Sequence, residues 1–414
     1  MNKRLLYVYC LIVACIAFFS QCINSAGKSS EPDLRGEKFA GAAACANCHK
    51  NIYDSWLSTA HHATSNPASK TTIKGSFAAD GNTYVYKDNM KVVMEDKANG
   101  LFQSGYINNS LRESHAFDVV VGSGTKAQTY LYWDNGKYFQ LPVSYFIAEH
   151  SWANSPGFPA EQPKFDRLIP STCFGCHSSA VGLKNTKLEG LVLHEEFEKN
   201  KVIYGIDCER CHGPAAEHVQ FHTEHPQEKK PMYLTNIASL KNQQKLDMCA
   251  ICHSGLKTPQ KPMFEFMPGD SVSDYFYPDF TKATRATEMD VHGTQYQLFT
   301  ASKCSIKSVS MNCSSCHNPH NNEKNNLQGF NQKCMTCHTT DNHNFCSNKS
   351  VPMTTLVQNC VDCHMPALAS GKITLLTNGK YSPTPDYIRT HLITIYPEES
   401  DKVIARLLKR DSTR

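Results

Sequence analysis

A five-residue motif with the pattern Cys-x-x-Cys-His occurs seven times in this chain of 414 residues. Two thiols at this spacing can form thioether bonds with one porphyrin, and the adjacent imidazole can bind the porphyrin iron. We number the copies in chain order as motifs 1 to 7: Cys45–His49, Cys173–His177, Cys208–His212, Cys249–His253, Cys313–His317, Cys334–His338 and Cys360–His364. The chemistry that this pattern indicates is covalent attachment of c-type haem.

Each position in the motif has a predicted role. The haem-attaching cysteines are Cys45, Cys48, Cys173, Cys176, Cys208, Cys211, Cys249, Cys252, Cys313, Cys316, Cys334, Cys337, Cys360 and Cys363. The proximal iron ligands are His49, His177, His212, His253, His317, His338 and His364. The sequence therefore predicts seven covalently bound c-type haems.

Two other uses of paired cysteines fit this sequence poorly. Zinc sites place their histidine ligands several residues away from the cysteine pair, whereas here a histidine always follows directly. Redox disulfides use one Cys-x-x-Cys in a βαβ setting. The chain contains 19 Cys and 19 His, from which independent placement would produce only about 0.04 such motifs.

The N-terminal segment predicts export from the cytoplasm. Lys3 and Arg4 precede an apolar run over residues 5–19, and Ser20 and Gln21 then interrupt it. This pattern is typical of a cleaved signal peptide. The run also reaches about the lower limit of a membrane-spanning helix, so a retained anchor is the alternative.

A cysteine at the end of an apolar signal is typical of a bacterial lipoprotein. We place the lipid on Cys22, because the polar residues 24–32 would then form a flexible tether. Cys15 is the alternative, since the residue before it is small. We therefore expect an exported protein of the periplasm or outer membrane of a Gram-negative bacterium, attached to the membrane through a lipid anchor.

The motifs are unevenly spaced, and this spacing divides the chain. Six of the seven fall within residues 173–364, which leaves little room for an ordinary apolar core, so the porphyrins should supply much of it. We expect a mainly α fold with much irregular structure, a multihaem cytochrome c fold organised around stacked haems. The predicted segments are a signal peptide (1–22), a tether (23–38), a first haem segment (39–72), a β-rich insert (73–150), a six-haem domain (151–395) and a C-terminal helix (396–414).

The insert is expected to hold a small antiparallel sheet near residues 74–147. Five β-rich runs cover residues 83–86, 91–94, 117–121, 129–133 and 138–141. Asp134-Asn135-Gly136 predicts a tight turn between the last two. Its expected role is a scaffold beside the first haem, with a separate binding module as the alternative. Residues 51–62 predict a helix, and the apolar spacing over residues 401–410 predicts an amphipathic one.

Two further features concern covalent links and charge. Cys304 and Cys346 lie outside both the motifs and the signal, and in an oxidising compartment we expect them to form a disulfide. The formal net charge is only +4, so the composition does not favour a nucleic-acid partner.

Twelve histidines lie outside the motifs, which suffices for a second histidine ligand on every iron. Segments of the chain resemble the cytochrome c-552/4 domain family: motif 1 followed by Tyr53, Trp56, Thr59 and His61, and Gly205 to Pro214 with His218. Motif 5 with Asn318-Pro319-His320, and motif 7 with Met365-Pro366, are similar to octahaem hydroxylamine oxidoreductases and pentahaem nitrite reductases. The resemblance implies distal ligands at His61, His218 and His320, then His343 and His391, and we add His292 as a sixth.

Two functions are compatible with these features. The first is electron transfer through closely spaced bis-histidine haems, between a quinol-linked or periplasmic donor and a terminal reductase or outer-membrane acceptor. The alternative is a reductase of nitrite, hydroxylamine or a sulfur oxyanion, with one haem open to substrate. No motif ends in lysine, unlike the catalytic haem of the nitrite reductases, and the motif number differs from the octahaem enzymes. We therefore expect electron transfer and assign no catalytic residue.

Overall fold

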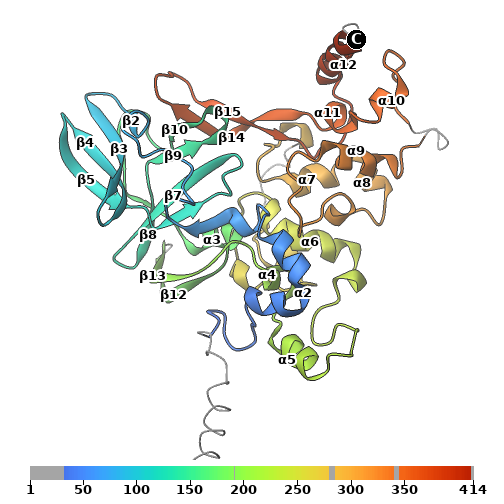
Figure 1. Ribbon diagram of the computed structural model, residues 1–414, viewed down its shortest axis with the longest axis horizontal. Helices are drawn as coiled ribbons and strands as arrows, with labels where there is room; N and C mark the ends of the chain where they lie inside the picture. The colour runs from blue at the N-terminus through green and yellow to red at the C-terminus, as the bar shows by residue number, and fades with distance from the viewer. Residues whose placement is uncertain (1–31, 191, 279–284, 340–344, 412–414) are drawn as a thin grey trace, which may run out of the picture.

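The computed structural model describes residues 32–190, 192–278, 285–339 and 345–411. It is 30% helical and 27% strand, with large antiparallel sheets, so the prediction of a mainly α fold is wrong. Figure 1 shows the strands gathered on one side of the molecule and most helices on the other. The prediction failed because β-pairing extends well beyond residues 74–147. The predicted signal peptide, Cys15, Cys22 and His343 lie outside the described residues.

The larger sheet combines strands from distant parts of the chain. Its order is β1 (Ser65–Pro67), β6 (Val119–Val121), β7 (Ala127–Asp134), β9 (Val143–Phe146), β10 (Ser151–Asn154), β14 (Ala367–Thr377) and β15 (Thr384–Arg389). β8 (Lys137–Gln140) pairs with β7, and β11 (Arg167–Leu168) pairs with β8. Ala153 lies opposite Thr377, which attaches the C-terminal hairpin to the sheet. That hairpin, β14–β15, follows motif 7 directly (Figure 1).

The smaller sheet lies entirely inside the predicted insert. It contains β2 (Thr83–Val85), β3 (Met90–Lys97), β4 (Gly100–Ile107) and β5 (Ser110–Ala116), each antiparallel to the next. The predicted strands over residues 83–86, 91–94, 129–133 and 138–141 are confirmed as β2, β3, β7 and β8. Asn135 and Gly136 both have positive φ angles, 46° and 79°, as the predicted tight turn between β7 and β8 requires.

The two sheets share one apolar core. Val92 and Met94 of the smaller sheet are fully buried and belong to the same cluster as Tyr130, Val143 and Trp152 of the larger one. This side of the molecule therefore has an ordinary hydrophobic core that needs no cofactor. The helical side has a smaller apolar cluster, built from Ile251, Met263, Phe266, Tyr275 and Phe276.

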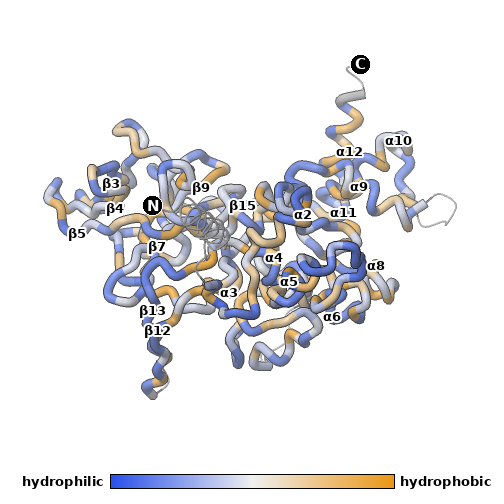
Figure 2. Tube along the Cα trace, turned by 60° about the horizontal axis from the view of Figure 1, so that its bottom comes forward, coloured by the Kyte–Doolittle hydropathy of each residue, from blue (hydrophilic) through white to orange (hydrophobic). Residues whose placement is uncertain are grey.

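A long hairpin separates motifs 2 and 3 in the sequence but brings them together in space. β12 (Ser178–Glu189) begins directly after motif 2, and β13 (Val192–Tyr204) ends shortly before motif 3. Ser178 lies opposite Tyr204 in the ladder, so both motifs lie at the same end of the hairpin. The other end projects away from the body of the molecule (Figure 2).

The haem motifs lie on short helices or at helix ends. The helices are α2 (Ala42–Trp56), α3 (Ser171–His177), α4 (Cys208–His212), α5 (Ala216–Glu224), α6 (Asn242–His253), α7 (Gln295–Thr300), α8 (Lys303–Lys307), α9 (Leu327–Met335), α10 (Met353–Leu356), α11 (Cys360–His364) and α12 (Pro397–Asp411).

The predicted C-terminal helix is confirmed as α12. The expected helix over residues 51–62 ends earlier, at Trp56, where the Thr59 hydroxyl donates to the Trp56 carbonyl. Within the described ranges, no helix has the length and apolarity to cross a membrane.

Gly205, which directly follows β13, lies close to the backbone of the segment before β1. Its φ is +67°, and a Cβ atom there would lie 2.1 Å from the carbonyl oxygen of His62. We predict that Gly205→Ala lowers the free energy of unfolding by more than about 4 kcal/mol, because strain and a backbone clash act together. Denaturant unfolding followed by circular dichroism measures this.

Gly379 provides the matched control. Its φ is +75°, but nothing lies within 4 Å of the added Cβ. Gly379→Ala should therefore show only the backbone strain, about 1–2 kcal/mol. Equal effects of the two substitutions would contradict the close approach at Gly205.

Candidate haem-binding sites

Thiols from different motifs meet in pairs. Side-chain interactions join Cys45 to Cys208, Cys176 to Cys252, Cys249 to Cys313, and Cys334 to Cys360. Weaker electrostatic interactions join Cys211 to Cys252 and Cys334 to Cys316. The motifs therefore follow one another in the order 1, 3, 4, 5, 6 and 7, with motif 2 beside motif 4. This order differs from the order in the sequence only in the placement of motif 2.

Three pairs of histidines face each other at nearly one distance. The ring centroids of His61 and His253 are 6.2 Å apart, those of His212 and His320 are 6.0 Å apart, and those of His317 and His391 are 6.1 Å apart. A metal–imidazole bond is about 2 Å long and the ring centre lies about 1 Å further on, so imidazoles on opposite sides of one metal ion have centres about 6 Å apart. Each pair joins a motif histidine to one outside the motifs, so the spacing fits a bis-histidine iron.

The relative orientation of the rings differs among the pairs. The His61 and His253 planes make an angle of 78°, whereas the planes of the other two pairs make angles of 26° and 29°. Burial lowers the pKa of His253 to about 4, with a further contribution from His61. Burial and the neighbouring His317 lower the pKa of His391 to about 4. These rings are therefore neutral at pH 7, which leaves a nitrogen lone pair for a metal.

The other candidate ligands have less specific surroundings. His292 lies within electrostatic range of His177 of motif 2. His49 and His218 both lie within such range of His212. The His218 ring also lies 4.6 Å from that of His222. His343 lies outside the described residues.

Hydrogen bonds at Nδ1 orient several of the imidazoles. Nδ1 of His364 faces the Thr394 carbonyl at 2.8 Å, and Nδ1 of His218 faces the Met232 carbonyl at 2.8 Å. Nδ1 of His177 lies 3.0 Å from the Thr64 hydroxyl. The two carbonyls can only accept, so they place the proton on Nδ1 of His364 and His218 and leave Nε2 for the metal, while the Thr64 hydroxyl orients the His177 ring. The residues present therefore fit c-type haem: paired thiols, an oriented imidazole and, in three cases, a second imidazole across the gap.

Ser65 joins the His61 segment to motifs 2 and 3. Its hydroxyl donates to the carbonyl of His177 at 2.7 Å and accepts from the N–H of Gly205 at 3.0 Å. Ser65 is completely buried. Close by, the indole of Trp56 donates to the Ile206 carbonyl at 2.9 Å. The segment that carries His61 is thus held by hydrogen bonds to residues that flank two other motifs.

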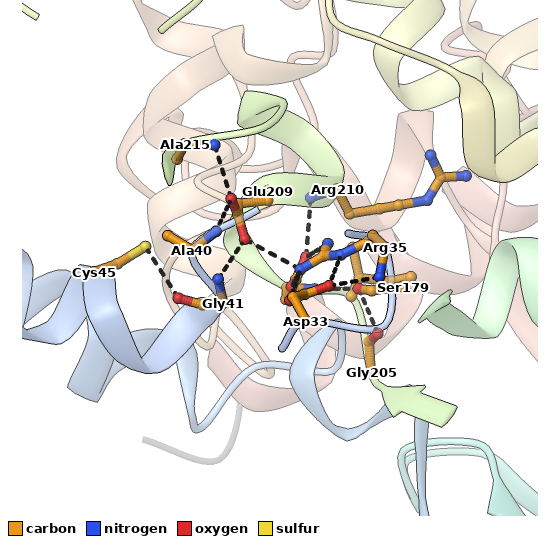
Figure 3. A network of polar contacts seen from close by, with 12 residues as sticks. Asp33, Arg35, Ala40, Gly41, Cys45, Ser179, Gly205, Glu209, Arg210 and Ala215 are labelled. Carbon is orange, nitrogen blue, oxygen red and sulfur yellow. Dashed lines mark hydrogen bonds and ion pairs between the residues drawn. The ribbon is translucent and has the colours of Figure 1, made fainter. Parts of the chain in front are cut away.

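A buried ionic network fixes the start of motif 1 against motif 3 (Figure 3). Arg35 contacts Asp33, Asp207 and Glu209 at 2.9, 2.7 and 3.1 Å. The carboxylate of Glu209 also accepts hydrogen bonds from the backbone N–H groups of Ala40 and Gly41. Burial alone would lower the pKa of Arg35, but the hydrogen bonds to Asp33 and the charge of Asp207 raise it overall.

Sequence reasoning did not identify this network. Arg35 and Asp33 belong to the segment that we predicted as a tether, yet their side chains are only 10% exposed. Glu209 occupies a variable position of motif 3 and is almost fully buried. The only signal was the pairing of opposite charges at residues 33 and 35, which is too common to indicate a buried contact.

The expected disulfide between Cys304 and Cys346 does not form, since both thiols are free. Each lies near a different set of motif cysteines. Cys304 interacts electrostatically with Cys316 and Cys337, whereas Cys346 interacts with Cys363. That prediction is therefore wrong, because the chain places the two cysteines beside different motifs.

We predict that Arg35→Leu lowers the free energy of unfolding by about 3–5 kcal/mol, because it leaves two buried carboxylates without their cation. Lys50→Ala is the control, since Lys50 and Asp54 form an ion pair in which both side chains are more than half exposed. That change should alter stability by less than about 1 kcal/mol. The midpoint of denaturant unfolding checks both, and an Arg35→Leu effect no larger than that of the control contradicts a stabilising role for the buried ionic network.

Comparisons with known proteins agree with these features. The family model for cytochrome c554 and c-prime matches residues 44–93 and 148–213, which contain motifs 1 to 3. No curated protein matches the chain. The crystal structure of the outer cell wall cytochrome OcwA has a similar fold, with a TM-score of 0.54 and 17% identity, and the match covers 88% of this chain and 81% of that one. With the repeated motif, these findings confirm the prediction that the chain is a multihaem c-type cytochrome with covalently bound haem.

Proposed function

We propose that this protein conducts electrons through seven c-type haems, one on each motif. The observation that supports this most strongly is the proximity of successive motifs, from motif 1 through 3, 4, 5 and 6 to 7: side-chain contacts join 1 to 3, 4 to 5 and 6 to 7, and electrostatic interactions join 3 to 4 and 5 to 6. Haems attached to neighbouring motifs would lie close together, and closely spaced haems exchange electrons rapidly. Motif 2 adds a branch at motif 4.

The histidine pairs supply the axial ligands in this proposal. His61 binds the motif 4 haem, His320 the motif 3 haem and His391 the motif 5 haem, each at the spacing that a shared iron requires. His292 binds the motif 2 haem, since it lies within electrostatic range of His177. A haem with two imidazole ligands has no free position for substrate, so bis-histidine ligation favours conduction over catalysis.

These assignments also explain how the fold serves the function. When the distal ligand comes from another segment, that segment and the haem motif bind the same iron and are linked through it. His61 precedes β1 but serves motif 4, and His391 follows β15 but serves motif 5. The middle of the haem series, at motifs 4 and 5, is thereby fixed to the larger sheet, which contains β1 and β15. A rigid series keeps the distances for electron transfer constant.

The cellular setting is part of the proposal. The similar protein is named an outer cell wall cytochrome, and haem is attached to Cys-x-x-Cys-His outside the cytoplasm. Both support an exported protein that carries electrons between a quinol-linked or periplasmic donor and a terminal reductase or outer-membrane acceptor. We keep the lipid anchor at Cys22 in the proposal, on the sequence pattern alone.

The haem number can be counted directly. We expect the purified holoprotein to contain seven haems per chain by intact mass and by the pyridine haemochrome spectrum. A double substitution of Cys334 and Cys337 by Ala should remove one haem and leave six. A wild-type count below seven would contradict the assignment of one haem to every motif.

The ligand pairs predict distinct paramagnetic signals. Perpendicular imidazole planes give a more axial low-spin ferric signal than nearly parallel planes. His61→Ala should therefore abolish an axial low-spin signal, and His391→Ala a rhombic one, each with the gain of one high-spin haem in seven. Electron paramagnetic resonance of the oxidised protein measures both.

His225 offers a control for these variants. It is exposed and packs beside Phe221, so His225→Ala should leave the spectrum unchanged. A high-spin signal in the wild-type protein that shifts on addition of nitrite or hydroxylamine would contradict the conduction proposal and support the reductase alternative.

A further inference from the structure

Helix α8 and the loop that follows it carry exposed apolar side chains beside two haem motifs. The side chains of Ile306 and Val309 are 66% and 93% exposed. On the same helix Cys304 is partly buried, within electrostatic range of Cys316 of motif 5 and Cys337 of motif 6. Two helical residues at positions i and i+2 point about 200° apart. Ile306 therefore faces away from the haem-attaching thiols, which lie behind the helix.

Hydrogen bonds fix α8 to the segment that supplies the proposed distal ligand of motif 5. Ser302 directly precedes the helix and is almost completely buried. Its hydroxyl donates to the carbonyl of His391 at 2.9 Å and accepts from the N–H of Ile393 at 2.8 Å. The His391 ring in turn faces that of His317 in motif 5. The helix is thus held at the surface, on the helical side of the molecule (Figure 1), directly beside the proposed motif 5 haem.

The surface around α8 is positively charged. Residues 301–339 contain four lysines and one glutamate, and no aspartate or arginine. Lys303 and Lys307 are exposed on α8, and Lys333 of α9 is exposed beside motif 5. The glutamate, Glu323, is engaged by a motif 5 histidine at 3.2 Å. In the part of the chain that the structure describes, no ion pair includes any of these three lysines.

We propose that α8 and the loop after it are the docking surface for an acidic electron-transfer protein, which exchanges electrons with the haems of motifs 5 and 6. An apolar centre with a polar rim is the usual composition of a protein interface, and opposite charges speed the encounter. A helix is about 10 Å wide, so a partner that contacts Ile306 comes close to the haems behind it. The inference rests on the proposed electron-transfer function and adds the charge of the partner and its place of contact.

The test is the reduction of the oxidised holoprotein by the hydroquinone of a purified flavodoxin, a small acidic one-electron donor, in a stopped-flow spectrophotometer. The second-order rate constant of the wild-type protein should fall as salt is added, because salt screens opposite charges. The double variant Lys303→Glu with Lys307→Glu should lower that rate constant at low salt by about tenfold or more and lose the salt dependence. A double variant that keeps the wild-type rate constant and salt dependence would overturn the proposal.

A second double variant, Lys137→Glu with Lys164→Glu, makes the same change of net charge on the sheet side. Lys137 belongs to β8, Lys164 precedes the buried Phe165 of the sheet core, and both lysines are exposed. This variant should keep the wild-type rate constant, and an equal loss would overturn the proposal because net charge would explain both. Photoreduced lumiflavin, a small neutral donor, should reduce both variants at the wild-type rate. Slower reduction of the α8 variant by lumiflavin would place the defect in the haems and also overturn the proposal.

Ile306→Ser tests the apolar centre. It removes apolar area but no charge, so it should lower the rate constant with flavodoxin at every salt concentration and keep the salt dependence. A rate constant equal to that of the wild type would overturn the role of the apolar centre.

Vesicles of anionic phospholipid distinguish protein docking from membrane binding, because lysines attract both. An α8 double variant that loses cosedimentation with the vesicles but reacts with flavodoxin as the wild type does would overturn the proposal. Lumiflavin separates this inference from the proposed function. A wild-type protein in which lumiflavin does not reduce seven haems contradicts the function, whereas an α8 variant that reacts normally with flavodoxin contradicts only the docking surface.

Discussion

The contact between haem motifs that are distant in the sequence is the constraint on which the rest of the structure depends. Each motif is too short to fold alone, and each packs its thiols against those of another motif. The segments between motifs must therefore return the chain to the same region. The β12–β13 hairpin does this for motifs 2 and 3, because its antiparallel ladder brings its first and last residues together.

The two halves of the molecule meet this constraint by different physical means. The sheet side has a conventional core of buried aromatic and branched residues, such as Tyr130, Val143 and Trp152, so its stability rests on apolar burial. Where the motifs meet, the structure uses polar junctions, such as Ser65 between motifs 2 and 3 and Glu209 between motifs 1 and 3. Buried polar junctions of this kind tolerate little displacement, because each lost partner leaves a desolvated group. They suit a part of the molecule whose distances set its function.

The sequence was sufficient for the cofactor class and for local structure, but not for long-range pairing. Asn135 and Gly136 predicted their turn because a positive φ is a local property. The pairing of Ala153 with Thr377 could not be predicted, because it depends on two segments more than two hundred residues apart. The helix expected to reach His61 ends at Trp56, whose carbonyl accepts hydrogen bonds from both the N–H and the hydroxyl of Thr59. Arg35 was missed because burial of an ion pair has no periodic signature.

Arg35 and Arg210 show how one motif can combine two kinds of electrostatic balance. The carboxylates that surround Arg35 belong to the protein, so that contact between motifs 1 and 3 needs only the chain itself. Among the described residues, the Arg210 guanidinium contacts two backbone carbonyls and one aromatic ring, so this junction is balanced by dipoles and not by carboxylates. One of these carbonyls belongs to Gly175 of motif 2. The two arginines thus hold motif 3 against motif 1 on one side and against motif 2 on the other, which makes motif 3 a fixed point among the motifs.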